Sequence, residues 1–277
     1  MLRLLLSLLV TVVALSGRTV HAGILYGADG SGGNLSTLFT IDTATGAATP
    51  IGAIGFSITA LAFDPTTGDL YGGTSRTPIF SGGPNGLVRI DVATGTGTYI
   101  GDYNYFTNNM SDIAFNSAGT LYGADTGGGL YTIDTSTGQA SFIGDPSPST
   151  NSPGIAFDSQ GTLYMDGKGG LFTIDPTTGG IASTIFSTIG SQYGQALAFD
   201  ENNVAYSLKQ ISTNQDVKFL RTLITIDTST GGYTEIGATA DKMDALAFAP
   251  IGVPEPTSLT LLGLGVAGFV VLRRRSA

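Results

Sequence analysis

The chain has 277 residues, with 12 basic residues against 21 acidic ones, a formal net charge of −9 and no cysteine. The acidic balance makes nucleic acid and anionic lipid surfaces poor partners, and the lack of cysteine excludes disulfides and thiol chemistry. Only 12% of the residues are charged and 41 are glycine, which is typical of many short strands joined by tight turns.

The first 22 residues have the features of a signal peptide. Arg3 supplies a positive charge, residues 4–15 form an apolar run that is short for a membrane span, and residues 20–22 resemble a small-residue cleavage site. We therefore expect export and cleavage after Ala22. The alternative is an N-terminal membrane anchor that stays, because Arg18 is unusual so close to a cleavage site.

Most of the remaining chain repeats one unit. Each unit has a strand resembling Leu-Tyr-Gly, a strand ending in Ile-Asp, a turn closed by glycine, a strand ending near Ile-Gly, and a strand resembling Ala-Leu-Ala-Phe. The Ile-Asp aspartates are Asp42, Asp91, Asp134, Asp175 and Asp227, so the spacings are 49, 43, 41 and 52 residues. Four short strands at this period are typical of β-propeller blades.

Four of the units are continuous, and the fifth is composite. The continuous units start at residues 60–63, 112–115, 154–157 and 196–199. Residues 23–27 form a second strand, and residues 245–248 supply the first strand that it lacks. We therefore predict one all-β domain over residues 23–250, a five-bladed β-propeller whose last blade is closed by the N- and C-terminal strands.

The aromatic residues that recur in the first and second strands are predicted to pack between neighbouring blades. They are Phe63, Phe115, Phe157, Phe199 and Phe248, together with Tyr26, Tyr71, Tyr122, Tyr164 and Tyr206. The Ile-Asp aspartates are predicted to accept backbone hydrogen bonds in turns closed by Gly46, Gly95, Gly138, Gly179 and Gly231. A cation site at these aspartates is the alternative.

The irregular segments are expected at one mouth of the ring, where propellers place the loops that enter the first strand and join the second strand to the third. They cover residues 75–86, 102–111, 192–195 and 207–221. Loops that vary on a repeated scaffold commonly carry the function, and tyrosine and asparagine offer surfaces for sugar rings. The predicted ligand-binding residues are Tyr103, Tyr105, Asn108, Asn109, Tyr193 and Gln195.

Five aspartates are expected at the same mouth. Asp29, Asp125 and Asp166 follow second strands, whereas Asp112 and Asp244 lie at first strands. If all five face the axis, their oxygens form a candidate site for a hard cation such as Ca²⁺. The alternative is that they are solvated surface residues.

Catalysis has little support in the composition. His21 is the only histidine and lies in the leader, so the mature chain lacks the residues of common triads and zinc sites. The glutamates are Glu201 beside a turn, Glu235 in an outer strand and Glu255 near the C-terminus. We predict a non-catalytic binding protein; the alternative is a carbohydrate-cleaving enzyme that uses two aspartates at the channel mouth.

The C-terminal segment has three parts in order. Val253-Pro254-Glu255-Pro256 precedes an apolar run at residues 257–272, which is followed by Arg273, Arg274 and Arg275. A transmembrane helix over this run would be about 24 Å long against a hydrocarbon core of about 30 Å, and the arginines favour a cytoplasmic C-terminus. This tail resembles the PEP-CTERM sorting signal of secreted bacterial proteins.

The resemblance implies a Gram-negative bacterium that makes exopolysaccharide. It also implies passage through the inner membrane by the export machinery, transient anchoring, and cleavage near the motif by an exosortase-type protease. The protein would then reach the cell surface or extracellular matrix, where polysaccharide or surface proteins are its expected partners. An ordinary permanent tail anchor is the alternative. Five of the 12 basic residues lie in the two terminal segments, which leaves seven against 21 acidic residues, a net charge of −14.

Overall fold

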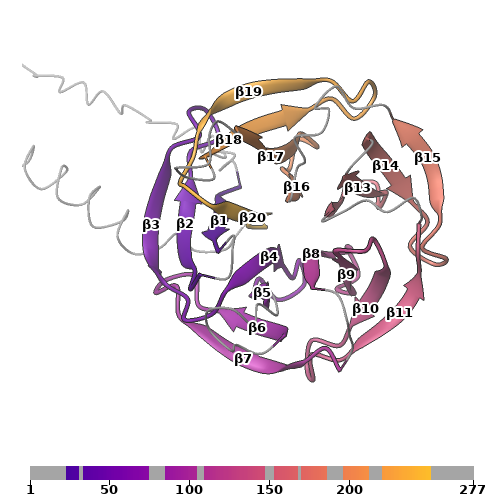
Figure 1. Cartoon of the computed structure of the whole chain (residues 1–277), viewed down its shortest axis with the longest axis horizontal. Helices are drawn as coiled ribbons and strands as arrows, with labels where there is room; N and C mark the ends of the chain where they lie inside the picture. The colour runs from indigo at the N-terminus through magenta and orange to yellow at the C-terminus, as the bar shows by residue number, and fades with distance from the viewer. Residues whose placement is uncertain are drawn as a thin grey trace, which may run out of the picture.

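The computed structural model describes residues 23–30, 34–74, 85–104, 109–146, 153–167, 170–185, 196–211 and 220–250. These residues form twenty strands in five antiparallel four-stranded sheets, arranged as blades around a central axis (Figure 1). In these ranges no helix is long and apolar enough to cross a membrane. The leader and the C-terminal sorting segment, with every processing residue proposed above, lie outside the described residues.

The strands of each blade are given from the axis outward. Blade 1 contains β20 (Met243–Phe248), β1 (Leu25–Asp29), β2 (Thr37–Ile41) and β3 (Ala48–Ala53). Blade 2 contains β4 (Ile58–Phe63), β5 (Leu70–Thr74), β6 (Gly86–Ile90) and β7 (Gly97–Asp102). Blade 3 contains β8 (Met110–Phe115), β9 (Leu121–Asp125), β10 (Leu130–Ile133) and β11 (Ala140–Gly144). Blade 4 contains β12 (Gly154–Phe157), β13 (Leu163–Gly167), β14 (Gly170–Ile174) and β15 (Ile181–Ile185). Blade 5 contains β16 (Leu197–Phe199), β17 (Ala205–Ile211), β18 (Leu220–Ile226) and β19 (Tyr233–Ala238).

The ring is closed in blade 1, where the two ends of the domain meet. Strand β1 pairs with β20 on one side and with β2 on the other, with Leu25 opposite Phe248 and Gly27 opposite Leu246. Figure 1 shows β20 beside β1 at the inner edge of this blade. The predicted five blades and their closure by the terminal strands are therefore confirmed, and the inner edge of β1 is covered.

The recurrent aromatic rings join neighbouring blades, as predicted. In each contact, the tyrosine of a second strand meets the phenylalanine of the next blade's innermost strand, with ring centroids 5.1 to 5.5 Å apart. The pairs are Tyr26–Phe63, Tyr71–Phe115, Tyr122–Phe157, Tyr164–Phe199 and Tyr206–Phe248. Tilted and edge contacts at this distance stabilise aromatic pairs beyond simple burial.

The Ile-Asp aspartates form the predicted turns. Each accepts a backbone N–H bond from the second residue after it, at 2.7 to 2.8 Å. The turn glycines have φ angles from 71° to 80°, in the left-handed region that glycine adopts readily. The repeated Asp-x-x-Thr-Gly pattern is thus explained by turn geometry.

The same turns also dock on neighbouring blades. Four glycines of the outer strands lie against the turn of the next blade, where an added Cβ atom would meet the carbonyl oxygen of a threonine. The pairs are Gly52–Thr94, Gly101–Thr137, Gly144–Thr178 and Gly237–Thr45. The Ile-Gly of the repeat therefore has a packing role at four of the five blade junctions, because only a residue without a side chain lets the two backbones approach this closely.

Candidate functional site

The two mouths of the ring differ in the loops that surround them. At the mouth where the inner strands end, which we call the short-turn mouth, all nine connections between strands are five or six residues long. At the opposite mouth, which we call the loop-rich mouth, the connections differ in length. The shortest consists of residues 168–169, and the longest consist of residues 75–85 and 186–196. Large differences in connection length are therefore confined to the loop-rich mouth, where the irregular segments were predicted from the sequence.

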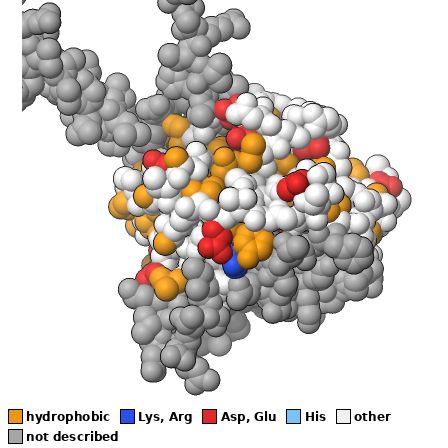
Figure 2. Space-filling view, turned by 90° about the horizontal axis from the view of Figure 1, so that it is seen from above, with side chains coloured by type: hydrophobic (Ala, Val, Ile, Leu, Met, Phe, Trp, Pro, Cys, Tyr) orange, Lys and Arg blue, Asp and Glu red, His pale blue; other side chains and the backbone are white. Residues whose placement is uncertain are grey.

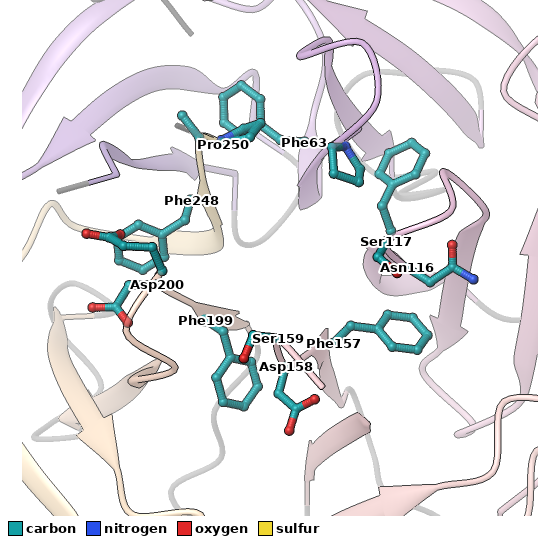
Figure 3. Close-up of a pocket in the computed structure, with 14 residues that line it drawn as sticks. Phe63, Asn116, Ser117, Phe157, Asp158, Ser159, Phe199, Asp200, Phe248 and Pro250 are labelled. Carbon is teal, nitrogen blue, oxygen red and sulfur yellow. The ribbon is translucent and has the colours of Figure 1, made fainter. Parts of the chain in front are cut away.

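The short-turn mouth contains a cavity of about 260 Å³, formed by the ends of the inner strands. Figure 3 shows that the rings of Phe63, Phe157, Phe199 and Phe248 fan away from the central opening, toward the tyrosines on which they pack. Asp158, Asp200 and Glu201 line this cavity. The carboxylates of Asp158 and Asp200 each accept two backbone N–H bonds in their own turns, and Glu201 accepts one from the N–H of Gly23. These side chains are therefore explained by the architecture of the ring.

Asp112 lies at the loop-rich end of inner strand β8 and is completely buried. One carboxylate oxygen, Oδ1, accepts a bond from the N–H of Ile113 at 2.9 Å. The other, Oδ2, accepts bonds from the N–H groups of Ile155 at 2.8 Å and Leu197 at 3.3 Å. This single side chain therefore connects the inner strands of blades 3, 4 and 5. Burial raises the pKa of Asp112 well above its ordinary value, and the three N–H bonds oppose that rise.

Two further aspartates are buried at blade junctions. Asp166 in blade 4 accepts a hydrogen bond from the Ser207 hydroxyl of blade 5 at 3.1 Å, and burial raises the pKa of Asp166 to about 7. Asp244 in blade 1 lies 3.5 Å from the guanidinium of Arg221 in blade 5. Burial raises the pKa of Asp244 to about 6, although Arg221 opposes the rise. Arg221 also donates to the carbonyl of Met243 at 3.0 Å, so it binds blade 5 to the closing strand.

The remaining two aspartates hold loops within their own blades. Asp29 is half-buried and accepts a bond from the N–H of Thr37 at 2.6 Å; burial raises the pKa of Asp29. Asp125 accepts N–H bonds from Gly127 and Gly129 through Oδ1, and its Oδ2 accepts a bond from the Tyr131 hydroxyl at 3.0 Å. Both side chains thus shape the connection between the second and third strands.

A cation site at these five aspartates stays a prediction. Within the described ranges there is no group of three or more histidine, cysteine, aspartate or glutamate residues placed to hold a metal ion. All five aspartates do lie toward the loop-rich mouth, where Asp29, Asp112, Asp125 and Asp166 accept hydrogen bonds from the fold and Asp244 forms an ion pair with Arg221. We therefore assign them to the joining of blades and the shaping of loops.

The predicted ligand-binding residues divide into two groups. Tyr103 is fully buried among Ala60, Leu87 and Met110, so its ring packs in the core and is not the exposed surface that the sequence led us to expect. Asn109 is partly exposed next to β8, and its backbone carbonyl accepts a bond from the N–H of Thr126 at 2.8 Å. Tyr105, Asn108, Tyr193 and Gln195 lie outside the described residues.

Sequence reasoning missed the role of Asp112, although the repeat contains a signal for it. At the matching position of the other inner strands, counted back from the final phenylalanine, the chain has Ala60, Gly154, Ala196 and Ala245. A carboxylate in a place otherwise occupied by small residues indicates a specific partner, because an unpaired charge is costly to bury.

Asp166→Asn should make stability less dependent on pH. An aspartate titrates near pH 3.9 in the unfolded chain, whereas burial raises the pKa of native Asp166 to about 7. Between these values the native state binds more protons, so the wild type loses stability as the pH rises. We expect the variant to be more stable than the wild type by about 2 kcal/mol at pH 8 and equal to it near pH 4. Urea unfolding at both pH values measures this, and a difference independent of pH would contradict it.

The described domain belongs to the class of five-bladed β-propellers closed by pairing of the terminal strands. Residues 252–275 match the family described as the PEP-CTERM protein-sorting motif. The chain therefore carries the signal of an exported protein that is sorted to the cell surface by exosortase-type machinery. The match covers the tail alone, and no curated protein matches the sequence.

Several solved structures are similar to the propeller. TolB from Acinetobacter baumannii has a TM-score of 0.52 at 13% identity, covering 82% of this chain and 67% of that one. Glutaminyl cyclase from Myxococcus xanthus has a TM-score of 0.46 at 17% identity, covering 68% and 70%. Hydrazine synthase from Kuenenia stuttgartiensis has a TM-score of 0.43 at 13% identity, covering 67% and 49%, so this chain spans about half of its length. At these identities the likeness concerns the fold alone.

Proposed function

We propose that this protein is a non-catalytic component of the cell surface or extracellular matrix whose propeller binds extracellular polysaccharide or protein at the loop-rich mouth. The observation that carries the proposal is the difference between the two mouths. Uniform turns at one mouth serve the scaffold, whereas the connections at the other mouth vary in length and sequence. Variable loops on a rigid scaffold are the usual place for recognition.

Charge and loop composition favour a neutral, hydroxyl-rich partner. On the face in view in Figure 2, acidic side chains outnumber basic ones among the described residues, in keeping with the net charge of −9. Anionic polymers would be repelled by such a surface. The segments between strands at the loop-rich mouth contain tyrosine and asparagine, which supply flat apolar rings and amide hydrogen bonds. Polysaccharide is therefore the first ligand to test, with a surface protein as the second.

The described carboxylates support a non-catalytic role. A glycosidase needs two carboxyl groups about 5 to 10 Å apart that are free to act on the substrate. Asp112, Asp125 and Asp166 instead accept hydrogen bonds from backbone or side-chain donors of the fold. Glu235 lies in outer strand β19 and forms an ion pair with Lys209 at 2.6 Å, away from the axis.

The test compares two substitutions in segments predicted at the loop-rich mouth with two substitutions at the short-turn mouth. Tyr105→Ala with Tyr193→Ala should weaken binding of extracellular polysaccharide, purified from the producing bacterium, by about tenfold, because an aromatic contact at a binding site contributes about 1.4 kcal/mol or more. Titration calorimetry with the processed protein measures the affinity. Ser117→Ala with Ser159→Ala is the matched control, since both serines are exposed at the short-turn mouth.

Two outcomes would contradict the proposal. Equal loss of affinity in both pairs of variants would remove the assignment to the loop-rich mouth. Appearance of new reducing ends in the polysaccharide during incubation would show cleavage, and the carbohydrate-cleaving alternative would then replace the non-catalytic role. If polysaccharide is not bound, capture of purified surface proteins by the same variants tests the second ligand.

A further inference from the structure

The start of the described chain lies at the junction between the first and last blades. The backbone N–H of Gly23 donates to Oε2 of Glu201 at 3.0 Å. Glu201 belongs to the turn between β16 and β17 in blade 5, whereas Gly23 leads into β1 of blade 1. One residue on, the carbonyl of Ile24 accepts a bond from the N–H of Ala249 at 2.9 Å, so the chain is fixed on both sides of this point.

The surroundings of Gly23 are tight for a side chain. A Cβ atom at this position would lie 3.0 Å from the carbonyl oxygen of Ala249 and 3.2 Å from Oε2 of Glu201. Both contacts are closer than ordinary van der Waals distances. Glycine at position 23 therefore lets the backbone nitrogen reach the Glu201 carboxylate without displacing either neighbour.

Removal of the leader changes the chemistry of that nitrogen. In the precursor it belongs to a neutral peptide bond with one N–H. After cleavage behind Ala22 it is the α-amino group of the mature protein, which is protonated at neutral pH because such groups ordinarily titrate near pH 7.7 to 8.0. A hydrogen bond between an ammonium group and a carboxylate is roughly twice as strong as one between neutral partners, and an ammonium offers three donors in place of one.

We propose that leader cleavage after Ala22 completes the closing junction of the ring, because the new α-ammonium of Gly23 forms an ion pair with Glu201 that joins blade 1 to blade 5. The inference rests on the cleavage site expected from the sequence and is independent of the ligand. The exported form would then be more stable than the same propeller still joined to its leader. A cut one residue later would remove the partner of Glu201.

A cycle of two changes tests the ion pair. The processed protein is purified after export, its N-terminus is identified by mass spectrometry, and the α-amine is acetylated, which removes its charge and keeps one N–H. Acetylation should lower the Tm of the wild type by about 2 to 4 °C, the shift expected for roughly 1 kcal/mol in a domain of this size. In Glu201→Gln the same acetylation should shift the Tm by less than about 1 °C.

Glu201→Asp provides a second variant in case the glutamine variant folds poorly. It keeps the charge on a shorter side chain, so acetylation should have a smaller effect than in the wild type. Equal shifts in all three proteins, or no shift in the wild type, would overturn the proposed ion pair. An N-terminus other than Gly23 in the exported protein would overturn the link to leader removal, and the mass measurement separates that failure from the others.

Discussion

Asp112→Ala is expected to lower the free energy of unfolding by about 3 kcal/mol. The substitution leaves the N–H groups of Ile113, Ile155 and Leu197 without their acceptor, and an unsatisfied buried donor costs about 1 to 3 kcal/mol. Relief from burying a carboxylate offsets part of this loss. Urea unfolding followed by tyrosine fluorescence suits the measurement, because the chain has no tryptophan.

Asp102→Ala is the matched control for this experiment. Asp102 is exposed and accepts one backbone bond, from the N–H of Asn104 at 2.8 Å, so its removal should cost at most about 1 kcal/mol. Asp112→Asn should fall between the two, because an amide retains one acceptor oxygen but turns an N–H₂ group toward backbone donors. If Asp112→Ala costs no more than Asp102→Ala, the carboxylate does not join the three blades in solution.

The fold was predictable because its determinants recur in every unit. The tyrosine of the second strand, the Asp-to-Gly turn and the final phenylalanine identify the blades by position alone. The composite unit predicts the pairing of β1 with β20. The pattern repeats because every blade packs against its neighbours in the same way. The contact between Tyr26 and Phe63, with its equivalents at the other junctions, is part of this packing.

The roles of single residues at the loop-rich mouth were less predictable, because they depend on partners distant in sequence. Asp112 bonds to residues 43 and 85 positions away, in two other blades. Tyr103 was expected to be exposed because it follows a strand in an irregular segment. Its ring instead packs among Ala60, Leu87 and Met110, and a Cβ added at Gly73 would lie 3.0 Å from its hydroxyl oxygen. These neighbours are distant in sequence, so the local pattern around Tyr103 does not predict its burial.

The glycine contacts between blades give the second large expected effect. Gly101→Ala should lower the free energy of unfolding by about 3 kcal/mol and the Tm by roughly 6 to 12 °C. The new methyl group would meet the carbonyl oxygen of Thr137, whose turn is held by the bond from the N–H of Gly138 to the carbonyl of Asp134 at 2.7 Å. A backbone contact of this kind cannot be relieved by changing a rotamer, so blade 3 must shift relative to blade 2.

Gly180→Ala is the control that separates this blade contact from a general cost of replacing glycine. Gly180 follows the turn glycine Gly179, and an added Cβ would lie 3.4 Å from the Thr178 hydroxyl oxygen, an ordinary contact, so the change should cost less than about 0.5 kcal/mol. Comparable losses in the two variants would mean that the blade junction tolerates a methyl group at Gly101. A large loss in Gly101→Ala alone would show that the recurrent Ile-Gly sets the distance between blades.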